Sequence, residues 1–529
     1  MLDRLQVERE RGITVKAQTV SLLYDYKGQT YLLNLVDTPG HVDFNYEVAR
    51  SLGACQGVIL LVDASQGVQA QTVANFYLAF EAELAIIPVL NKLDLKHANP
   101  EEVSEQISSL FDMDPEEILK VSAKTGQGMG DILPAVIEKI PPPPGKPENP
   151  LKALVFDSWY DQYKGPVALV AIKDGTLCKG DKLKTYHTNK VLQVEALGVM
   201  HPDPVPVPEM YAGQVGYIHS SLRKVEEAQV GDTWFRQETP VDPLPGFRPA
   251  KPMVFAGIYP MEGADYEQLK SSISRLTLND PSVTVHPDSS EALGRGWRLG
   301  FLGLLHMEVF SQRLEQEYGT SVIMTSPNVP YKVKLSSKKA IAEYGGEEIT
   351  ILNPAQFPPH NLIEEYYEPL VKGTVIAPTE YLAPIQSLIM ERRGRDMESV
   401  CIDNKRIMYH AVLPLSEVII DFFDMLKSKT SGYASFDYEE YGYEPTNLVQ
   451  IKVSLNDKEV DELSMVAHLS KAKTEARKLT FKLRHEIPRQ LYEVRIQARI
   501  GGKVVSTEKL SAVKKMSQLN VMVEMSPEK

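Results

Sequence analysis

Short apolar runs that end in a polar residue recur along the first 140 residues. They cover residues 31–36, 57–62 and 85–90, and they are followed by Asp37, Asp63 and Asn91. Runs of this length with polar ends are typical of buried strands. The carboxyl ends of parallel strands meet at one edge of a sheet, and ligands bind beyond that edge. The pattern therefore predicts a doubly wound α/β unit with its functional side chains at the strand ends.

The pattern changes after the proline run at residues 141–144, which favours an extended linker. Short β-rich runs are then separated by the turns Asp174-Gly175, Gly180-Asp181 and Gly231-Asp232. Strands divided by such turns predict a small antiparallel barrel.

Helical and strand patterns alternate after a second proline-rich joint at residues 243–249. We predict strands at residues 251–258 and 283–286, and helices at residues 266–276 and 304–317. The glycine-rich residues 294–300 are interpreted as a turn between strands. His306 lacks the spacing of a metal-binding helix and is interpreted as a packing residue.

These changes of pattern predict a multidomain α/β protein with a doubly wound domain, a β-barrel and α+β sandwich domains. The predicted domains are residues 1–140, an incomplete α/β domain; 151–247, the barrel; 250–330, α+β; 331–362, a linker region; 363–442, α+β; and 443–529, a C-terminal domain.

Composition excludes several classes of protein. At 529 residues and 43% hydrophobic content, the chain has material for several cores. Its three cysteines lie far apart without ligand partners, which argues against disulfide and zinc frameworks. No apolar run approaches the ~20 residues of a membrane helix.

Charge is distributed unevenly. The chain has 57 Lys+Arg and 70 Asp+Glu, a net charge of −13. Residues 451–529 hold 16 of the bases and 10 of the acids, a net of +6, which leaves −19 for the rest. A basic end on an acidic body indicates either a localised RNA-facing surface or helix-surface charge that aids solubility. Composition does not decide between these alternatives.

The residues after the strands have the chemistry of a GTPase. The segment Asp37-Thr38-Pro39-Gly40-His41 follows the first run. Asp37 would hold a magnesium-bound water, the Gly40 N–H would contact the terminal phosphate, and His41 would orient the attacking water. Taken alone, each motif also fits an ordinary turn or helix cap.

A second group of motifs provides guanine recognition. Asn91-Lys92-Leu93-Asp94 supplies an amide and a carboxylate for the base, with the Lys92 stem over the purine. Ser122-Ala123-Lys124 follows a further apolar segment. We expect both groups of loops to converge on one nucleotide cleft. The predicted nucleotide-binding residues are Asp37, Thr38, Pro39, Gly40, His41, Asn91, Lys92, Leu93, Asp94, Ser122, Ala123 and Lys124.

The phosphate-binding spacing G-x-x-x-x-G-K-[ST] does not occur in these 529 residues. The sequence starts within what is interpreted as the first switch loop, and Thr14 is predicted to bind Mg²⁺ together with Asp37. Several lost phosphate contacts would weaken nucleotide binding by orders of magnitude. An incomplete gene or a shortened isoform is the expected explanation.

Together these motifs resemble the ribosomal translocase-type GTPases. Residues 300–308, Gly-Phe-Leu-Gly-Leu-Leu-His-Met-Glu, with residues 431–438 and Ile487-Pro488-Arg489-Gln490, resemble the elongation factor 4 (LepA) family and its organellar branch. The resemblance implies a GTP hydrolase with GTP/GDP and Mg²⁺ as cofactors and His41 as the catalytic residue. It also implies back-translocation or remodelling of stalled ribosomes, with ribosomal RNA and tRNA as partners.

The resemblance further implies a monomer in the mitochondrial matrix, with peripheral association with the inner membrane; a bacterial cytoplasm is the second choice. The competing hypothesis is a non-enzymatic ribosome-binding module that keeps the shape of the factor. A tRNA-delivering factor of the Tu type is disfavoured, because residues 366–438 and the basic end extend beyond its three-domain plan. The ending at residues 516–525 departs from the basic end of the family.

Overall fold

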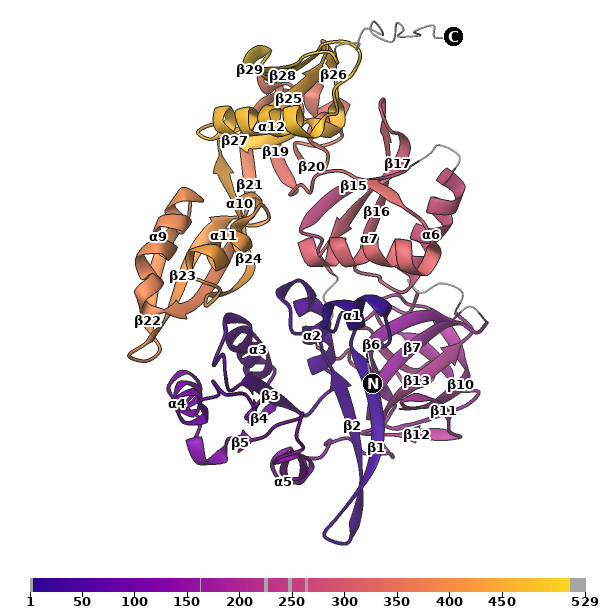
Figure 1. Cartoon of the computed structure of the whole chain (residues 1–529). Helices are drawn as coiled ribbons and strands as arrows, with labels where there is room; N and C mark the ends of the chain where they lie inside the picture. The colour runs from indigo at the N-terminus through magenta and orange to yellow at the C-terminus, as the bar shows by residue number, and fades with distance from the viewer. Residues whose placement is uncertain (1–2, 162, 223–226, 246–249, 262–264, 514–529) are drawn as a thin grey trace, which may run out of the picture.

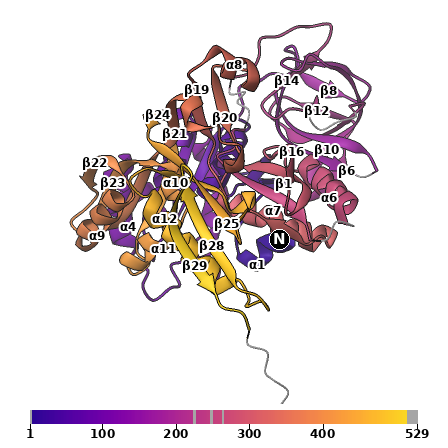
Figure 2. The same cartoon turned by 90° about the horizontal axis from the view of Figure 1, so that it is seen from above.

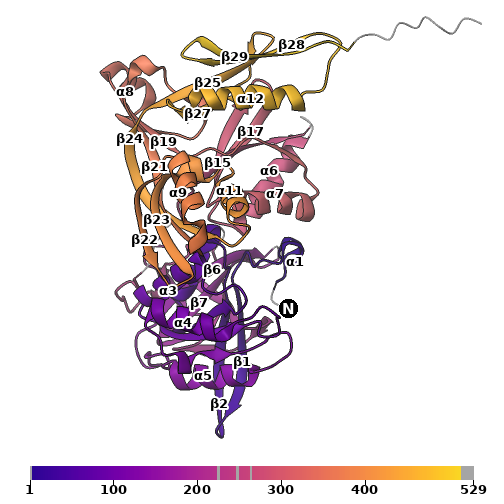
Figure 3. The same ribbon diagram turned by 60° about the vertical axis from the view of Figure 1, so that its left-hand side comes forward.

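The computed structural model describes residues 3–161, 163–222, 227–245, 250–261 and 265–513. Figure 1 shows the N-terminal α/β unit beside the barrel at one end of the molecule. The α+β units lie above them, and the C-terminal sheet lies at the far end (Figure 3). Within the described ranges, no helix has both the length and the apolar character needed to cross a bilayer.

Three parallel strands form the centre of the N-terminal unit in the order β3 (Gly57–Asp63), β4 (Ala85–Asn91) and β5 (Leu119–Lys120). One face buries Leu60 and Val62 under α3 (Ala70–Glu81) and α4 (Pro100–Phe111). The other face packs Ile87 and Val89 against α5 (Ile132–Lys139). Helices thus cover both faces of the parallel sheet, which confirms the predicted fold class.

The first predicted strand is not part of this sheet. Among the described residues, strand β2 (Gln29–Asp37) pairs only with β1 (Gln18–Tyr26), in a separate antiparallel hairpin. None of its residues is fully buried, and Leu32 is 39% exposed. The prediction of a buried parallel strand at residues 31–36 is therefore wrong. The hairpin instead lies against the barrel strand β10 (Val191–His201), where His201 Nδ1 is 2.7 Å from the Ser21 carbonyl oxygen.

The predicted antiparallel barrel is confirmed. Its strands are β10, β13 (Val215–Ser220), β7 (Gly165–Asp174), β6 (Lys152–Asp161), β14 (Thr233–Arg236) and β9 (Lys182–Thr185). Strand β9 pairs with both β14 and β10, and this closes the ring. The short strand β11 (Asp203–Pro206) pairs with β10, while β8 (Thr176–Cys178) and β12 (Glu209–Tyr211) pair with each other in a separate two-stranded sheet. Closure leaves the barrel with a core of its own, which includes the fully buried Trp234.

The third unit is a four-stranded sheet in the order β16 (Thr284–Ser290), β17 (Gly294–Phe301), β15 (Val254–Pro260) and β18 (Val322–Met324). Helices α6 (Tyr266–Leu278) and α7 (Leu304–Tyr318) pack on it, as predicted. The interpretation of residues 294–300 as a turn is wrong, because they form the interior strand β17. A Cβ at Gly296 would lie 2.4 Å from the Tyr259 ring, so this glycine gives an aromatic side chain room to cross the strand.

The predicted linker at residues 331–362 is also wrong. It contains β19 (Tyr331–Leu335), α8 (Lys338–Tyr344) and β20 (Glu348–Ile351). The two strands join the sheet β20-β19-β21-β23-β22, in which β24 also pairs with β21. Its remaining elements are β21 (Ile363–Pro378), β22 (Arg395–Cys401), β23 (Arg406–Pro414), β24 (Ser435–Thr446), α9 (Leu382–Glu391), α10 (Leu415–Val418) and α11 (Phe422–Lys429).

The last described unit is the sheet β26-β25-β28-β29, with β27 paired to β25. Its elements are β25 (Leu448–Leu455), β26 (Lys458–Glu459), β27 (Met465–His468), α12 (Ala472–Glu486), β28 (Val494–Ile500) and β29 (Lys503–Leu510). Helix α12 lies along this sheet, as Figure 2 shows from above. The predicted departure at residues 516–525 lies outside the described residues.

Candidate nucleotide site

Hydrogen bonds tie together the loops that follow β4 and β5. Asn91, the last residue of β4, accepts bonds at Oδ1 from the backbone N–H of Lys92 (2.7 Å) and of Ala123 (3.0 Å). Ser122 is fully buried, and its hydroxyl donates to Asp94 Oδ1 at 2.7 Å. The two predicted guanine motifs are thus side by side, and their polar atoms hold each other in place.

An acid that the prediction omitted supports these loops. Asp63 ends β3, and its Oδ2 lies 2.7 Å from Lys92 Nζ. Burial raises the pKa of Asp63, but hydrogen bonds from Lys92 and Ser65 outweigh it, and the pKa is lowered. In the sequence, Asp63 stands at the end of an apolar run, as Asn91 does, and this position could have identified it as a site residue. Lys92 itself has φ of 66°, a left-handed backbone.

The electrostatics keep Asp94 ionised. Its pKa is lowered chiefly by the Ser122 hydrogen bond, with help from the charges of Lys124 and Lys92. An ionised carboxylate is a pure acceptor and suits the adjacent N–H donors on the edge of guanine. Leu93 fixes the loop through its backbone N–H, 3.4 Å from the Val121 carbonyl oxygen, while Lys124 is exposed.

The residues predicted to hold magnesium lie in an acidic neighbourhood. Thr14 donates from its hydroxyl to Asp3 Oδ1 at 3.2 Å. Asp37 ends β2, and its pKa is raised by burial and by the nearby charges of Asp3 and Glu8. Among the described residues, no group of three or more His, Cys, Asp or Glu side chains has the geometry of a metal site.

His41 begins the short helix η1 (Val42–Phe44). Its Nδ1 accepts a hydrogen bond from the Asp43 backbone N–H at 3.2 Å, so a neutral ring carries its proton on Nε2. The His41 side chain is 35% exposed. Before it in the loop, Thr38 is half-buried, Pro39 is buried and Gly40 is exposed. His41 thus keeps one ring nitrogen available for a reacting group.

The phosphate-side and guanine-side residues form two separate groups. Within the described ranges, no hydrogen bond or ion pair joins residues 37–41 to residues 91–94 or 122–124. Their convergence on a single cleft therefore stays a prediction. What the structure does show is a guanine-side group that is already interlocked.

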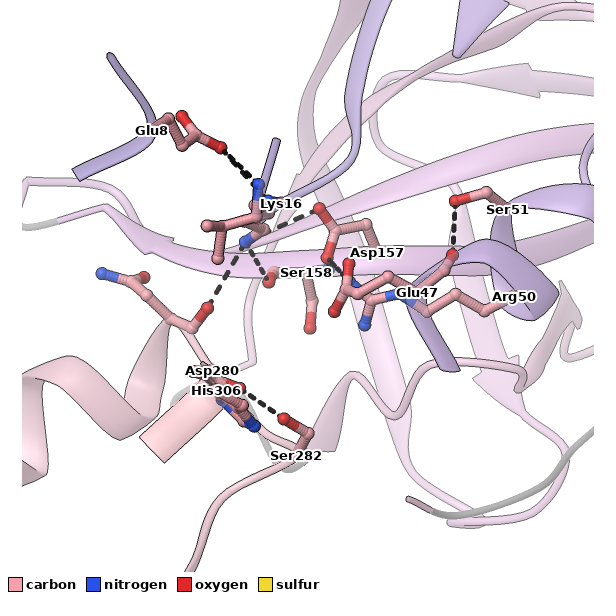
Figure 4. Close-up of polar contacts among 12 residues, drawn as sticks. Glu8, Lys16, Glu47, Arg50, Ser51, Asp157, Ser158, Asp280, Ser282 and His306 are labelled. Atoms are coloured by element: carbon pink, nitrogen blue, oxygen red, sulfur yellow. Dashed lines mark hydrogen bonds and ion pairs between the residues drawn. The ribbon is translucent and has the colours of Figure 1, made fainter. Parts of the chain in front are cut away.

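Sequence reasoning also missed a buried ion cluster, defined here as Lys16, Glu47, Arg50 and Asp157. It joins the α/β unit to the barrel (Figure 4). Arg50, on α2 (Asn45–Leu52), pairs with Glu47 and lies 2.9 Å from Asp157 Oδ1 on β6. Lys16 Nζ is 3.6 Å from Asp157 Oδ2 and also donates to the carbonyl oxygens of Ser158 and Asn279. No sequence motif connects these residues, because more than 100 positions separate Arg50 from Asp157.

The arginines that follow α9 pair with carboxylates. Arg393 donates to both oxygens of Glu368, at 2.8 and 2.7 Å, and its Nε is 3.1 Å from Glu417. Arg395 pairs with Glu444. These arginines are therefore structural links between strands and helices.

Four family models match successive parts of the chain. They are the elongation factor Tu GTP binding domain at residues 1–142, elongation factor G domain III at residues 249–326, the elongation factor G C-terminus at residues 365–453, and the GTP-binding protein LepA C-terminus at residues 455–523. The first match contains both groups of site residues described above.

Relatives with curated names are similar over nearly the whole chain. The human protein "Translation factor GUF1, mitochondrial" is 56% identical over 515 residues, which are 97% of this chain and 77% of that protein. "Translation factor waclaw, mitochondrial" of Drosophila melanogaster is 52% identical over 97% of this chain and 74% of its own length. A "GUF1 homolog, mitochondrial" of Arabidopsis thaliana is 51% identical over 97% and 77%.

One solved structure resembles this chain, and the likeness concerns the fold only. A crystal structure from Thermus thermophilus covers 84% of this chain and 91% of its own chain, with a TM-score of 0.56 and 20% identity.

Proposed function

The chain belongs to the mitochondrial GUF1 (LepA) family of translation factors, and from this premise we propose that it binds GTP and hydrolyses it on the ribosome. Its GTP-binding domain is of the elongation factor Tu type. The relatives are named as mitochondrial translation factors, which supports a mitochondrial location for this chain.

The main support for this proposal is that hydrogen bonds join the two loops on the guanine side. Ser122 fixes one oxygen of Asp94, and Asn91 fixes the backbone of Ala123. The loops are therefore ordered before any base arrives, and binding need not order them. Guanine offers two adjacent N–H donors to the Asp94 carboxylate, whereas adenine offers no such pair. The site accordingly favours guanine nucleotides.

On the phosphate side, the oxygen donors fit a hard divalent cation. Burial, together with repulsion from Asp3 and Glu8, raises the pKa of Asp37, and a nearby cation would relieve this repulsion. Thr14 and Asp37 would hold Mg²⁺, Asp37 through water, and the ion would neutralise phosphate charge. His41 would position the attacking water, since its Nδ1 is held by the Asp43 N–H and its Nε2 is left for the water.

We propose that the outer face of α12 contacts RNA of the ribosome or of tRNA. Lys473, Arg477 and Lys482 are exposed, and none of them forms an ion pair with another described residue. Phe481 lies among them, 56% exposed, and can stack on a base. This surface supports action on loaded ribosomes, of which back-translocation or remodelling of stalled complexes is the form we propose.

The guanine site is tested by titrating the chain with fluorescent GDP and XDP, alone and with a phosphate-loop segment joined ahead of Leu2. Asp94→Asn should weaken GDP binding by roughly 10- to 100-fold, because a charge-assisted bond contributes ~1.5–3 kcal/mol. It should strengthen XDP binding, because an amide can donate to the second carbonyl of xanthine. The exposed carboxylate of Asp131 provides the matched control Asp131→Asn, which should change neither affinity.

An unaltered base preference in Asp94→Asn would remove Asp94 from the site. Absence of nucleotide binding in both forms would favour the second function, a ribosome-binding module without turnover.

The α12 surface is tested by ribosome co-sedimentation over a range of salt concentrations. Replacing Lys473, Arg477 and Lys482 by Ala should weaken binding and flatten its dependence on salt, by up to about one unit of logarithmic slope for each lost phosphate contact. A control with the same charge change replaces the exposed Lys96, Lys338 and Lys339. Equal losses in the two triple variants would show that α12 has no special role.

A further inference from the structure

The helix α7 begins without a cap of its own. Its N-cap residue is Gly303, which has no side chain to accept a bond from the first turn. The first N–H groups of a helix have no partner within the helix, and an acceptor nearby stabilises them. The missing acceptor comes from another unit. Asp43 of η1 accepts at Oδ2 from the His306 backbone N–H at 3.2 Å.

The contact between Asp43 and α7 is so close that the residue at position 303 must be glycine. A Cβ at Gly303 would lie 2.2 Å from Asp43 Cγ and 2.3 Å from its Oδ1. The Asp43 side chain is only 4% exposed, so it has little room to move away. The partial positive charge of the helix N-terminus also favours the Asp43 carboxylate. Asp43 therefore acts as the cap of α7, across the boundary between two units.

The other side of Asp43 faces His41. The Asp43 backbone N–H donates to His41 Nδ1, and the Asp43 Oδ1 lies 3.6 Å from the same ring nitrogen. Phe44 completes the contact, with its ring 6.4 Å from the His41 ring and 5.7 Å from the His306 ring. The two oxygens of one buried carboxylate thus face the predicted catalytic ring and the start of α7.

The start of α7 is itself fixed. His306 Nδ1 accepts from the Leu302 backbone N–H at 3.2 Å, and its Nε2 is 2.7 Å from Asp280 Oδ2. Asp280 also accepts from the Ser282 hydroxyl at 2.6 Å (Figure 4). The helix end that holds Asp43 is therefore a rigid part of the third unit, which spans residues 254–324.

We propose that Asp43 is a positioning residue through which the third unit sets the orientation of His41. When α7 is docked, its first turn holds the Asp43 carboxylate, and Asp43 holds the His41 ring through Nδ1. When α7 withdraws, Asp43 loses its partner and His41 loses its fixed orientation. This inference rests on the proposed role of His41 in hydrolysis, and it adds a control of that residue from a domain outside the GTP-binding unit.

The decisive experiment is a double-mutant cycle with Asp43→Ala and Gly303→Ala in the full chain. Hydrogen exchange of residues 38–48 reports the order of the loop without requiring hydrolysis. Each single variant should speed this exchange roughly tenfold, the factor to which ~1.4 kcal/mol of lost capping corresponds. Replacing Asp43 by Ala removes the three atoms that lie nearest to the new methyl group, Cγ, Oδ1 and Oδ2 of Asp43. The second substitution should therefore add little to the first.

Gly130→Ala is the matched control, because a Cβ there meets no atom within 4 Å. It should leave exchange of residues 38–48 unchanged. Additive effects of Asp43→Ala and Gly303→Ala, or unchanged exchange in both single variants, would overturn the proposal.

A second readout separates positioning from general damage. GDP affinity should stay within twofold in Asp43→Ala and Gly303→Ala, while kcat for ribosome-stimulated hydrolysis falls and KM does not change. If His41→Ala leaves hydrolysis unchanged, the proposed role of His41 is wrong. The exchange data would still decide whether Asp43 couples the loop to α7, so the two failures can be told apart. Parallel loss of GDP affinity in both variants would indicate a purely structural role for Asp43.

Discussion

The guanine-side and phosphate-side groups of this molecule are held in place by different kinds of contact. The guanine-side bonds, from Asn91 to Ala123 and from Ser122 to Asp94, stay within one α/β unit. The His41 loop depends on partners in other units, because Asp43 contacts α7 of the third unit. Base recognition is therefore local, whereas the orientation of the predicted catalytic ring depends on how the domains are docked.

This difference suggests a division of labour that suits a factor acting on a large partner. Nucleotide identity can be read whatever the arrangement of domains, since its loops carry their own support. Hydrolysis would respond to any partner that moves the barrel or the third unit. Perturbing the domain contacts should therefore change the His41 side and leave the guanine side intact.

The largest expected effect comes from the buried ion cluster. Asp157 on the barrel strand β6 is 2% exposed and faces both Arg50 and Lys16. Asp157→Ala leaves these cations without their shared acceptor. Breaking a buried pair costs about 3–5 kcal/mol. We expect a matching loss in the free energy of unfolding in urea, together with faster hydrogen exchange at residues 38–52.

Hydrogen exchange on the guanine side should not change in the same variant. Exchange at residues 89–95, on the guanine side, should stay slow in Asp157→Ala until the whole unit unfolds. Asp203→Ala is the control, because its pair with Arg4 lies on the surface and is worth about 0–1 kcal/mol. Equal acceleration at residues 89–95 and 38–52 would show that the two sides are not independently supported.

The sequence alone predicted those features of the structure that depend on residues close together along the chain. The guanine motifs follow apolar runs whose strands pair in order, and the helices α6 and α7 have a clear 3.6-residue period. Strand β19 was within reach of the same reasoning, since Tyr331, Val333 and Leu335 alternate with polar residues and are all buried.

The errors have a common physical cause in contacts between distant segments. Gly296 and Gly300 of β17 make room for the Tyr259 and Phe255 rings on β15, so the spacing of these glycines resembles that of a turn only when the partner strand is unknown. Within the part of the chain that the structure describes, the apolar run at residues 31–36 pairs with β1 alone, which a count of apolar positions cannot show. The contacts of Asp43 and Asp157 could not be predicted for the same reason, because their partners lie 263 and 107 positions away along the chain.

A smaller and pH-dependent effect is expected from the strand β24, which also docks on the α/β unit. Its Ser435 hydroxyl accepts from the Ala70 backbone N–H at 2.9 Å. Two residues further, Asp437 is 5% exposed, and its Oδ1 has no hydrogen-bond partner among the described residues. Burial, together with the charges of Glu439 and Asp43, raises the pKa of Asp437 to about 7.

The sign of the effect follows from this raised pKa. The folded protein holds the Asp437 proton more tightly than the unfolded chain, whose pKa is near 3.9. Stability is therefore full below about pH 4, falls as pH rises toward 7, and stays reduced above it. Asp437→Asn removes this loss and should raise the free energy of unfolding at pH 8 by on the order of 4 kcal/mol, less whatever repacking costs.

Urea titrations at pH 8, 6 and 4 would measure this dependence, and the gain from Asp437→Asn should shrink steadily across them. The exposed Glu380, which is not among the charges that act on Asp437, offers the control Glu380→Gln, which should give a much flatter profile. A gain that does not change with pH would mean that Asp437 is not the titrating group. A gain that shrinks as pH falls, accompanied by slower exchange at residues 38–48, would place Asp437 among the contacts between units that govern the His41 loop. The guanine-side loops should show no such dependence, because Asn91, Asp94 and Ser122 have no partner on β24 among the described residues.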